Sequence, residues 1–347
     1  MKKFISILLC GVMLLGMVAC SSGKEEDKSS NNAKKETKQL EKVKVSEPVR
    51  GELWGPAYLA KALGFFEEEG LDVEFVTVQS DMPTAPVLSG DAQFGLYGPE
   101  MILGFNEKNQ GTKLLLSTTQ KYPYSFVVAP KYSSVKDMKG KTINGADSGS
   151  SPRAFVRSVL KENGLNPDTD ATYVNLPNSA LVAALEKEDV AGSYVSPSAR
   201  KIVLDAGNKL VEDIYNPEVH KKLIGSENYE MYITFTTDKY IKENPETVQK
   251  YVNAIYKAIL WTNENSAEKI IETLKPLFPG NEMLEDSVKE IKDNNIYSKD
   301  GSFTDDGYAA INRMSMASGV IKQEIPREKA IDDTFLKDAQ KNVKLDK

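Results

Sequence analysis

Short apolar segments alternate with amphipathic segments over most of the chain, and this alternation restricts the fold more than any other feature. The amphipathic segments begin or end at Gly and Pro, as helices commonly do. Predicted strands occupy residues 43–45, 71–76, 92–96, 113–119, 125–129, 141–143, 172–176, 192–195 and 209–214. Strands that alternate with helices over short turns are typical of a mostly parallel sheet. We therefore expect an α/β fold.

The C-terminal third of the chain is predicted to be helical, after a β-rich run at 229–236. In the longest segment Val248, Val252, Ile255 and Ile259 recur at helical spacing. The expected helices occupy residues 245–263, 270–274, 283–291, 305–318 and 327–339. A length of 347 residues leaves room for two domains.

The N-terminus has the pattern of an export signal. Lys2 and Lys3 precede an apolar run from Ile5 to Leu15 that is too short to span a bilayer comfortably. The Ala19-Cys20 step resembles a bacterial lipoprotein signal, which implies cleavage before Cys20 and lipidation of that residue with palmitate-like acyl chains. The polar stretch that follows cannot bury a core. We expect a signal peptide at 1–20 and a disordered tether at 21–40.

Charge and residue counts argue against several functions. The formal net charge is −6, which is unfavourable for binding nucleic acid. The chain has one histidine, and only Cys20 would remain after cleavage. A histidine-based metal site, a Ser-His-Asp triad and a thiol nucleophile are therefore not expected, and we expect no cofactor, no metal and no catalytic residue. His220 follows a loop-like segment and is interpreted as a surface residue.

One stretch, residues 144–155, has the character of a ligand cradle. It reads as a strand end, a loop of small residues and the first turn of a helix. Ser148, Gly149, Ser150 and Ser151 would present hydroxyls and unpaired backbone N–H groups at the positive end of that helix, where anionic or strongly polar groups bind. The alternative is an ordinary serine N-cap followed by Pro152, which requires no ligand.

Four segments of the chain resemble one family of binding proteins. They are residues 58–74 (YLAKALGFFEEEGLDVE), 88–95 (LSGDAQFG), 135–143 (VKDMKGKTI) and 160–167 (LKENGLNP). Their order and spacing are similar to those of the extracytoplasmic solute-binding proteins of ABC importers, in the group for nitrate, sulfonates, taurine and pyrimidine precursors of thiamine. This chain departs from the group in one segment, since the Gly-x-Val-Asp-Ala pattern is replaced by residues 188–192 (EDVAG), just before Ser193 to Pro197.

The resemblance implies a two-lobed periplasmic-binding-protein type II fold, with the ligand in the cleft between the lobes. Each lobe would be a mixed, mostly parallel sheet flanked by helices. Lobe 1 would comprise residues 41–126 and 232–347, and lobe 2 residues 127–231. The chain would cross between the lobes near 126–130 and 231–235.

The residues themselves indicate where the ligand would bind, because ligands of open α/β sheets lie beyond the carboxyl ends of strands. Small or polar residues follow several predicted strands. The expected ligand-binding residues are Trp54, Tyr97, Gly98, Glu100, Tyr122, Ser148, Gly149, Ser150, Ser151, Asn178, Ser196 and Tyr229.

The ligand class stays open at this point. The serine-rich helix start favours a sulfonate, phosphate or carboxylate, and Arg153 would pair with an anion if it faces the cleft. Glu100 and Asp147 favour a cationic or amino-bearing heterocycle instead. Tyr124 and Tyr194 join the aromatic residues that could stack on a flat ring.

The resemblance implies a monomeric, lipid-anchored protein outside the bacterial cell membrane, which captures a small solute and passes it to an ABC permease with its cytoplasmic ATPase. Two alternatives remain. One is a non-catalytic sensor or binding module. The other is an enzyme similar to the pyrimidine synthases that share this fold. Those enzymes depend on histidine and on a cysteine-rich motif, whereas this chain has one histidine and no such motif.

Overall fold

The computed structural model describes residues 39–78 and 82–345. The predicted signal peptide, Cys20 and nearly all of the predicted tether lie outside these residues. Within the described part of the chain, no helix is both long enough and apolar enough to cross a membrane.

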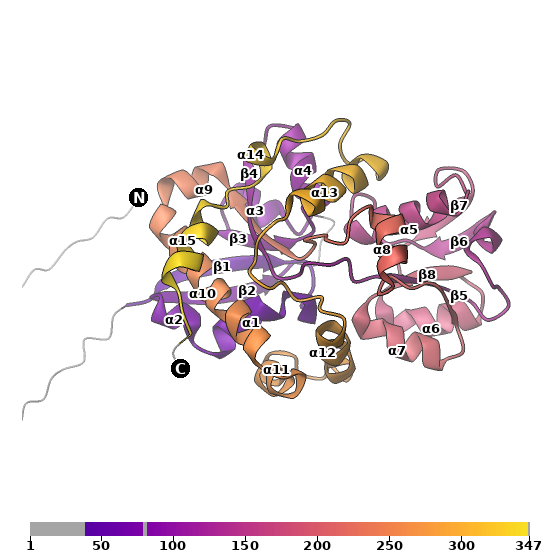
Figure 1. Cartoon of the computed structure of the whole chain (residues 1–347), viewed down its shortest axis with the longest axis horizontal. Coiled ribbons are helices and arrows are strands. Elements are labelled where there is room, and N and C mark those ends of the chain that lie inside the picture. Colours follow the sequence, from indigo (N-terminus) through magenta and orange to yellow (C-terminus); the bar gives the residue numbers. More distant parts are fainter. Residues whose placement is uncertain (1–38, 79–81, 346–347) are drawn as a thin grey trace, which may run out of the picture. The chain divides into compact units, whose positions relative to one another are not determined.

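The first sheet has five strands in the order β2-β1-β3-β10-β4. Strand β1 pairs in parallel with both β2 and β3, whereas β10 is antiparallel to β3 and β4. The strands are β1 (Glu41–Glu47), β2 (Leu71–Thr77), β3 (Phe94–Tyr97), β4 (Thr112–Ser117) and β10 (Ile233–Thr237). A strand from late in the chain therefore completes the sheet that the N-terminal part begins (Figure 1).

The second sheet repeats this arrangement in the order β7-β6-β8-β5-β9. Here β6 is parallel to β7 and β8, and β5 is the antiparallel strand between β8 and β9. The strands are β5 (Ser125–Val128), β6 (Lys141–Asn144), β7 (Ala171–Val174), β8 (Gly192–Val195) and β9 (Lys209–Glu212). Both sheets are thus mixed and mostly parallel, as expected from the alternation of strands and helices.

Helices from both ends of the chain cover the first sheet (Figure 1). Tyr251 of the longest helix stacks on Phe94 of β3 with ring centroids 3.8 Å apart, which fixes that helix against the sheet. The helices are α1 (Gly55–Ala62), α2 (Phe65–Glu68), α3 (Ala85–Ser89), α4 (Pro99–Glu107), α9 (Asp238–Glu243), α10 (Pro245–Glu264), α11 (Ala267–Leu274), α12 (Leu284–Asp293), α13 (Asp305–Ala317), α14 (Arg327–Ala330) and α15 (Thr334–Asn342).

The second sheet carries four helices, α5 (Ser151–Glu162), α6 (Asn178–Glu186), α7 (Pro197–Asp205) and α8 (Pro217–Ile224). Three further short helical turns lie at η1 (Glu52–Trp54), η2 (Val135–Met138) and η3 (Lys275–Leu277). In α5, Phe155, Val156 and Val159 are fully buried. These side chains fix the start of α5, and with it the predicted cradle, at the carboxyl end of β6.

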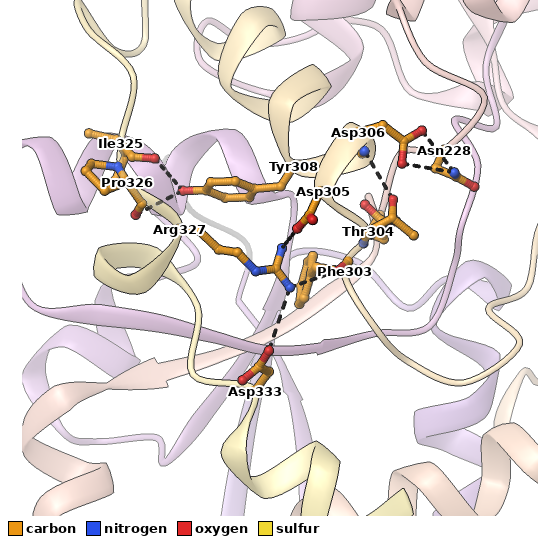
Figure 2. Close-up of polar contacts among 12 residues, drawn as sticks. Asn228, Phe303, Thr304, Asp305, Asp306, Tyr308, Ile325, Pro326, Arg327 and Asp333 are labelled. Atoms are coloured by element: carbon orange, nitrogen blue, oxygen red, sulfur yellow. Dashed lines mark hydrogen bonds and ion pairs between the residues drawn. The ribbon is translucent and has the colours of Figure 1, made fainter.

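Two segments join the two sheets, residues 118–124 and 225–232. The expected crossings near 126–130 and 231–235 overlap β5 and β10, and the second of them shares residues 231–232 with these connections. The position of the crossings stays a prediction. We propose that the lobe boundaries lie in these two connections. Figure 2 shows how the second connection is fixed, with Asn228 donating to Asp306 at the start of α13.

The structure corrects three predictions. The loop-like segment before His220 is the start of α8, which begins after the N-cap Asn216 and ends at Ile224, before the C-cap Gly225. The predicted surface position of His220 is wrong, because the side chain is 4% exposed. Its Nε2 accepts the backbone N–H of Tyr122 at 3.1 Å. The predicted helix at 327–339 is interrupted, since α14 ends at Ala330 and α15 starts at Thr334.

Candidate functional site

A cavity of about 880 Å³ lies between the two sheets. Much of its wall is formed by residues at or after the carboxyl ends of β1, β3, β6, β7 and β8, which are parallel strands of the two sheets. The lining residues are Pro48, Val49, Arg50, Gly51, Glu52, Leu53, Trp54, Tyr97, Gly98, Tyr124, Asp147, Ser150, Ser151, Pro152, Asn175, Leu176, Pro177, Asn178, Tyr194, Ser196, Ser198, Met231, Tyr232, Asn281 and Met283. The cavity therefore lies where ligands of open α/β sheets bind.

Aromatic rings form a large part of the wall. Trp54 meets Tyr232 edge to face with centroids 4.7 Å apart. The hydroxyl of Tyr232 lies 2.7 Å from that of Tyr124, and Tyr124 in turn packs against Tyr194. These rings come from η1, from β8 and from the two connecting segments, so they supply an apolar surface with hydroxyls at its edges. Such a surface fits a ligand with a flat or apolar body.

The wall also contains buried and exposed carboxyl groups. Glu52 accepts a hydrogen bond from Ser287 of α12, and burial raises its pKa. Asp147 is exposed and accepts a hydrogen bond from Asn175 Nδ2 at 2.8 Å. Glu52 is thus held by α12, whereas Asp147 is open to the cavity.

The loop that carries Asp147 is held from behind by Arg153. Its Nε donates to the carbonyl oxygen of Gly145 at 2.8 Å, and its guanidinium also bonds the carbonyl oxygen of Ala146. The guanidinium lies 4.0 Å from the ring centroid of Tyr173. These contacts support Ala146 in the left-handed region (φ 56°), which is uncommon for a residue with a Cβ. Arg153 does not line the cavity and has a structural role in this loop.

Seven of the predicted ligand-binding residues line the cavity: Trp54, Tyr97, Gly98, Ser150, Ser151, Asn178 and Ser196. Whether they contact a ligand stays a prediction. Ser150 is the N-cap of α5 and its Oγ accepts the N–H of Arg153, as in the alternative interpretation of this stretch. Asn178 Nδ2 bonds Ser196 and Ser198, and so joins the starts of α6 and α7.

The other five predicted residues lie outside the described lining: Glu100, Tyr122, Ser148, Gly149 and Tyr229. Glu100 is completely buried and accepts hydrogen bonds from Ser151 Oγ and, at 2.6 Å, from the hydroxyl of Tyr229. Burial raises the pKa of Glu100, and these two hydrogen bonds oppose the shift. The hydroxyl of Tyr122 donates to the carbonyl oxygen of Ser151. This cluster joins the starts of α4 and α5 behind the cavity wall.

Ser148 and Gly149 do not belong to this buried cluster. Ser148 is exposed, and a Cβ on Gly149 would lie 3.2 Å from Met101 of α4. Several lining residues were not among the predicted contacts, including Arg50, Asn175, Tyr232, Asn281 and Met283. Asn175 directly follows β7, but the predicted strand ran to residue 176 and so hid it from the rule of strand ends. Asn281 and Met283 come from the helical C-terminal third, where no local pattern marks them.

Comparisons with known proteins assign the family. The sequence model described as NMT1/THI5 like matches residues 54–269. The chain belongs to the NMT1/THI5-like family. This confirms the resemblance, and structural similarity confirms the two-lobed periplasmic-binding-protein fold. The alkanesulfonate-binding protein SsuA from Xanthomonas axonopodis pv. citri, solved bound to MOPS, has a TM-score of 0.65 and 15% identity, over 85% of this chain and 99% of that one.

Two curated relatives of this NMT1/THI5-like chain come from Bacillus subtilis (strain 168). One is provisionally named binding protein YtlA and is 26% identical over 84% of this chain and 88% of its own length. The other is provisionally named an aliphatic sulfonates-binding protein and is 24% identical over 83% and 86%. The desulfurization enzyme DSZB shares the fold, with a TM-score of 0.62 and 15% identity over 87% of this chain and 99% of that one. The relatives are thus binding proteins, and the fold also serves an enzyme.

Proposed function

We propose that this chain is the substrate-binding component of an ABC importer, anchored outside the cell membrane through a lipid on Cys20. It captures a small organic solute in the cavity by closure of the two lobes and delivers it to the permease. The observation that supports this most directly is the cavity itself, because residues from both sheets contribute to one wall of aromatic rings and polar strand ends. A site shared between two lobes suits capture and release by hinge motion.

An enzymatic function has less support. Among the described residues that line the cavity there is no histidine and no cysteine. The hydroxyl of Ser151 is bonded to the buried carboxyl group of Glu100, and Ser150 caps a helix. Neither serine has a histidine partner among the described contacts, and Glu100, which bonds Ser151, is completely buried. Binding without chemical change is the function that this wall supports best.

A thermal-shift screen tests the proposal. The mature chain with Cys20→Ser would be screened against taurine, alkane- and arylsulfonates, nitrate, thiamine pyrimidine precursors, flavins and purines. A true ligand at about 100 times its Kd stabilises the native state by about 2.7 kcal/mol, which raises Tm by several degrees.

Two variants, each of which removes one tyrosine ring, test whether the ligand binds in the cavity. Tyr97→Ala removes a ring from the cavity wall and should abolish the shift, whereas Tyr132→Ala removes a ring that does not line the cavity and should preserve it. A screen without hits, or a shift that survives Tyr97→Ala, would count against the cavity as the ligand site. Release of the Cys20→Ser protein from cells, with retention of the native protein in the membrane fraction, tests the anchor separately.

A further inference from the structure

The charged groups around the cavity differ from those expected for a sulfonate site. Apart from tyrosines, the described lining residues with ionisable side chains are Arg50, Glu52 and Asp147. Two of these three are acids. The question is therefore whether Arg50, or a helix start, is available to an anionic ligand.

Arg50 is already paired. Its Nε and Nη2 donate to one carboxylate oxygen of Glu47, at 3.1 and 3.0 Å, and its guanidinium lies 5.4 Å from the ring centroid of Tyr58. The Glu47 side chain is completely buried and also accepts the hydroxyls of Tyr58 and Thr77. A ligand anion that drew Arg50 away would leave a buried carboxylate without its counter-ion, which is costly.

The start of α5 is also occupied. Pro152 has no N–H, and the N–H of Arg153 is bonded to Ser150 Oγ. The carboxyl group of Glu100 reaches the same helix end from α4 through Ser151 Oγ. The protein therefore places its own acidic group at the position where the helix dipole would otherwise favour a ligand anion.

Asp147, in contrast, faces the cavity and has no ion-pair partner among the described salt bridges, although its charge also acts on the guanidinium of Arg153 behind the loop. Its recorded partner is the neutral amide of Asn175. Burial raises the pKa of Tyr97, and the charges of Asp147 and then Glu100 raise it further. Burial and then Asp147 raise the pKa of Tyr194 to about 12. Asp147, Tyr97 and Tyr194 all line the cavity, so the carboxylate shares this wall with one tyrosine from each sheet.

We propose that the ligand presents a positively charged nitrogen to Asp147, beside the rings of Tyr97 and Tyr194, so that the site takes organic cations in preference to sulfonates. This inference rests on the proposed function, since it assumes that the cavity is the ligand site. A carboxylate supplies the counter-charge, and aromatic faces attract cations that have lost part of their water. The rings of Trp54, Tyr124 and Tyr232 would hold the apolar body.

Two ligands that share a phenylethyl group and carry opposite charges test the proposed preference for cations. Calorimetric titration would compare phenethylamine with 2-phenylethanesulfonate on the mature Cys20→Ser protein. We expect the amine to bind more tightly, and its affinity to fall about tenfold or more in Asp147→Asn. The control Asp189→Asn removes the same charge from an exposed position of the second lobe outside the cavity, and should leave the affinity unchanged.

Other outcomes separate this inference from the proposed function. Tighter binding of the sulfonate, or an amine affinity that is equal in Asp147→Asn and the native protein, would overturn the cation assignment and leave the cavity as a ligand site. Binding of only a neutral heterocycle from the larger screen would do the same. If neither ligand of the pair binds and no compound of the larger screen stabilises the protein, both proposals fail.

Discussion

Buried acidic side chains set much of this protein's behaviour at the scale of single residues. Glu100 illustrates how a residue predicted to contact ligand acquires another role when it is buried. Its carboxyl group bonds Ser151 of α5 and Tyr229 of the second connection, and none of its surface is exposed. It therefore joins parts of the chain on either side of the cavity, and its effect on ligand would be indirect.

Glu100→Gln tests that role. The amide keeps one acceptor oxygen but cannot accept from both hydroxyls in the same way, so we expect the free energy of unfolding to fall by about 1–3 kcal/mol. Ligand affinity should change by less than about threefold, because the side chain does not line the cavity. Denaturant unfolding and calorimetric titration measure the two effects. A large loss of affinity at unchanged stability would show direct contact with the ligand.

Glu230 predicts a pH dependence of stability. Its Oε1 accepts from the backbone N–H and the hydroxyl of Thr304, while its Oε2 is buried without a partner among the described residues. Burial raises its pKa from 4.5 to about 7. Between these values the folded protein keeps a proton that the unfolded chain has released, so the stability contribution is present below pH 4.5 and is lost as pH rises towards 7.

The expected loss is about 3 kcal/mol between pH 4.5 and 8, since each tenfold change in acidity constant corresponds to 1.36 kcal/mol. His220 acts in the opposite direction, because burial lowers its pKa to about 4 and stability is lost as pH falls from 6.5. The difference in unfolding free energy between Glu230→Gln and the native protein isolates Glu230. That difference should shift in favour of the variant as pH rises, and a constant difference would contradict the assignment.

At the scale of secondary-structure elements, local pattern predicted most strands and the helices that cover them. The correct elements, such as α1 with Pro56 near its start and Gly64 after its end, have their own boundary signals. Helix α8 was not predicted, although Asn216-Pro217 is a helix-start signal. The helix has few apolar positions, and the local sequence does not indicate a buried partner for His220. The burial of His220 depends on Tyr122, far away in sequence.

The same distinction, between local sequence signals and contacts far away in sequence, applies to the residues of the site. Strand ends rich in small and polar residues identified the regions that form the cavity, since topology places them at one edge of each sheet. The direction of each side chain could not be predicted in this way. Glu100 points into the protein, while Asp147, in a loop with a residue at positive φ, lines the cavity.

The close approach of α4 and α5 gives a prediction at this scale. A Cβ added to Gly98, the N-cap of α4, would lie 2.2 Å from Ser151 Oγ and 3.1 Å from Glu100 Oε2. Gly98→Ala should therefore separate the two helix starts and weaken ligand binding about tenfold or more, while far-UV circular dichroism stays native. Gly90→Ala is an unsuitable control because Gly90 has a positive φ. A Cβ added to Gly51 would lie 3.8 Å from the ring of Trp54, which is an ordinary contact distance. Gly51→Ala should bind ligand more tightly than Gly98→Ala. An equal loss of ligand affinity in the two variants would contradict the steric argument.

At the scale of the whole molecule, the two lobes are held together by contacts on more than one side of the cavity. On one side, Arg157 Nε of α5 donates to the carbonyl oxygen of Ala317 at the end of α13, at 3.2 Å. On another, α7 packs against α12 (Figure 1). There Glu290 of α12 accepts the hydroxyl of Tyr215 at 2.6 Å and lies 3.5 Å from Nε of Arg200. Any motion that opens the cavity on this side must break the contacts of Glu290.

Glu290→Ala should therefore shift the protein towards a more open arrangement. Burial raises the pKa of Glu290, and the Tyr215 hydroxyl and the charge of Arg200 oppose that shift, so both partners favour the ionised carboxylate at neutral pH. Loss of these bonds, at about 1–2 kcal/mol, should increase the rate of ligand dissociation by about 5- to 30-fold. Small-angle scattering should give a larger radius of gyration for the ligand-free variant than for the native protein. Glu285→Ala is the matched control, because Glu285 is on the same helix but pairs only with Lys289 at an exposed position. If both variants scatter and release ligand like the native protein, the contact between α7 and α12 does not hold the lobes together.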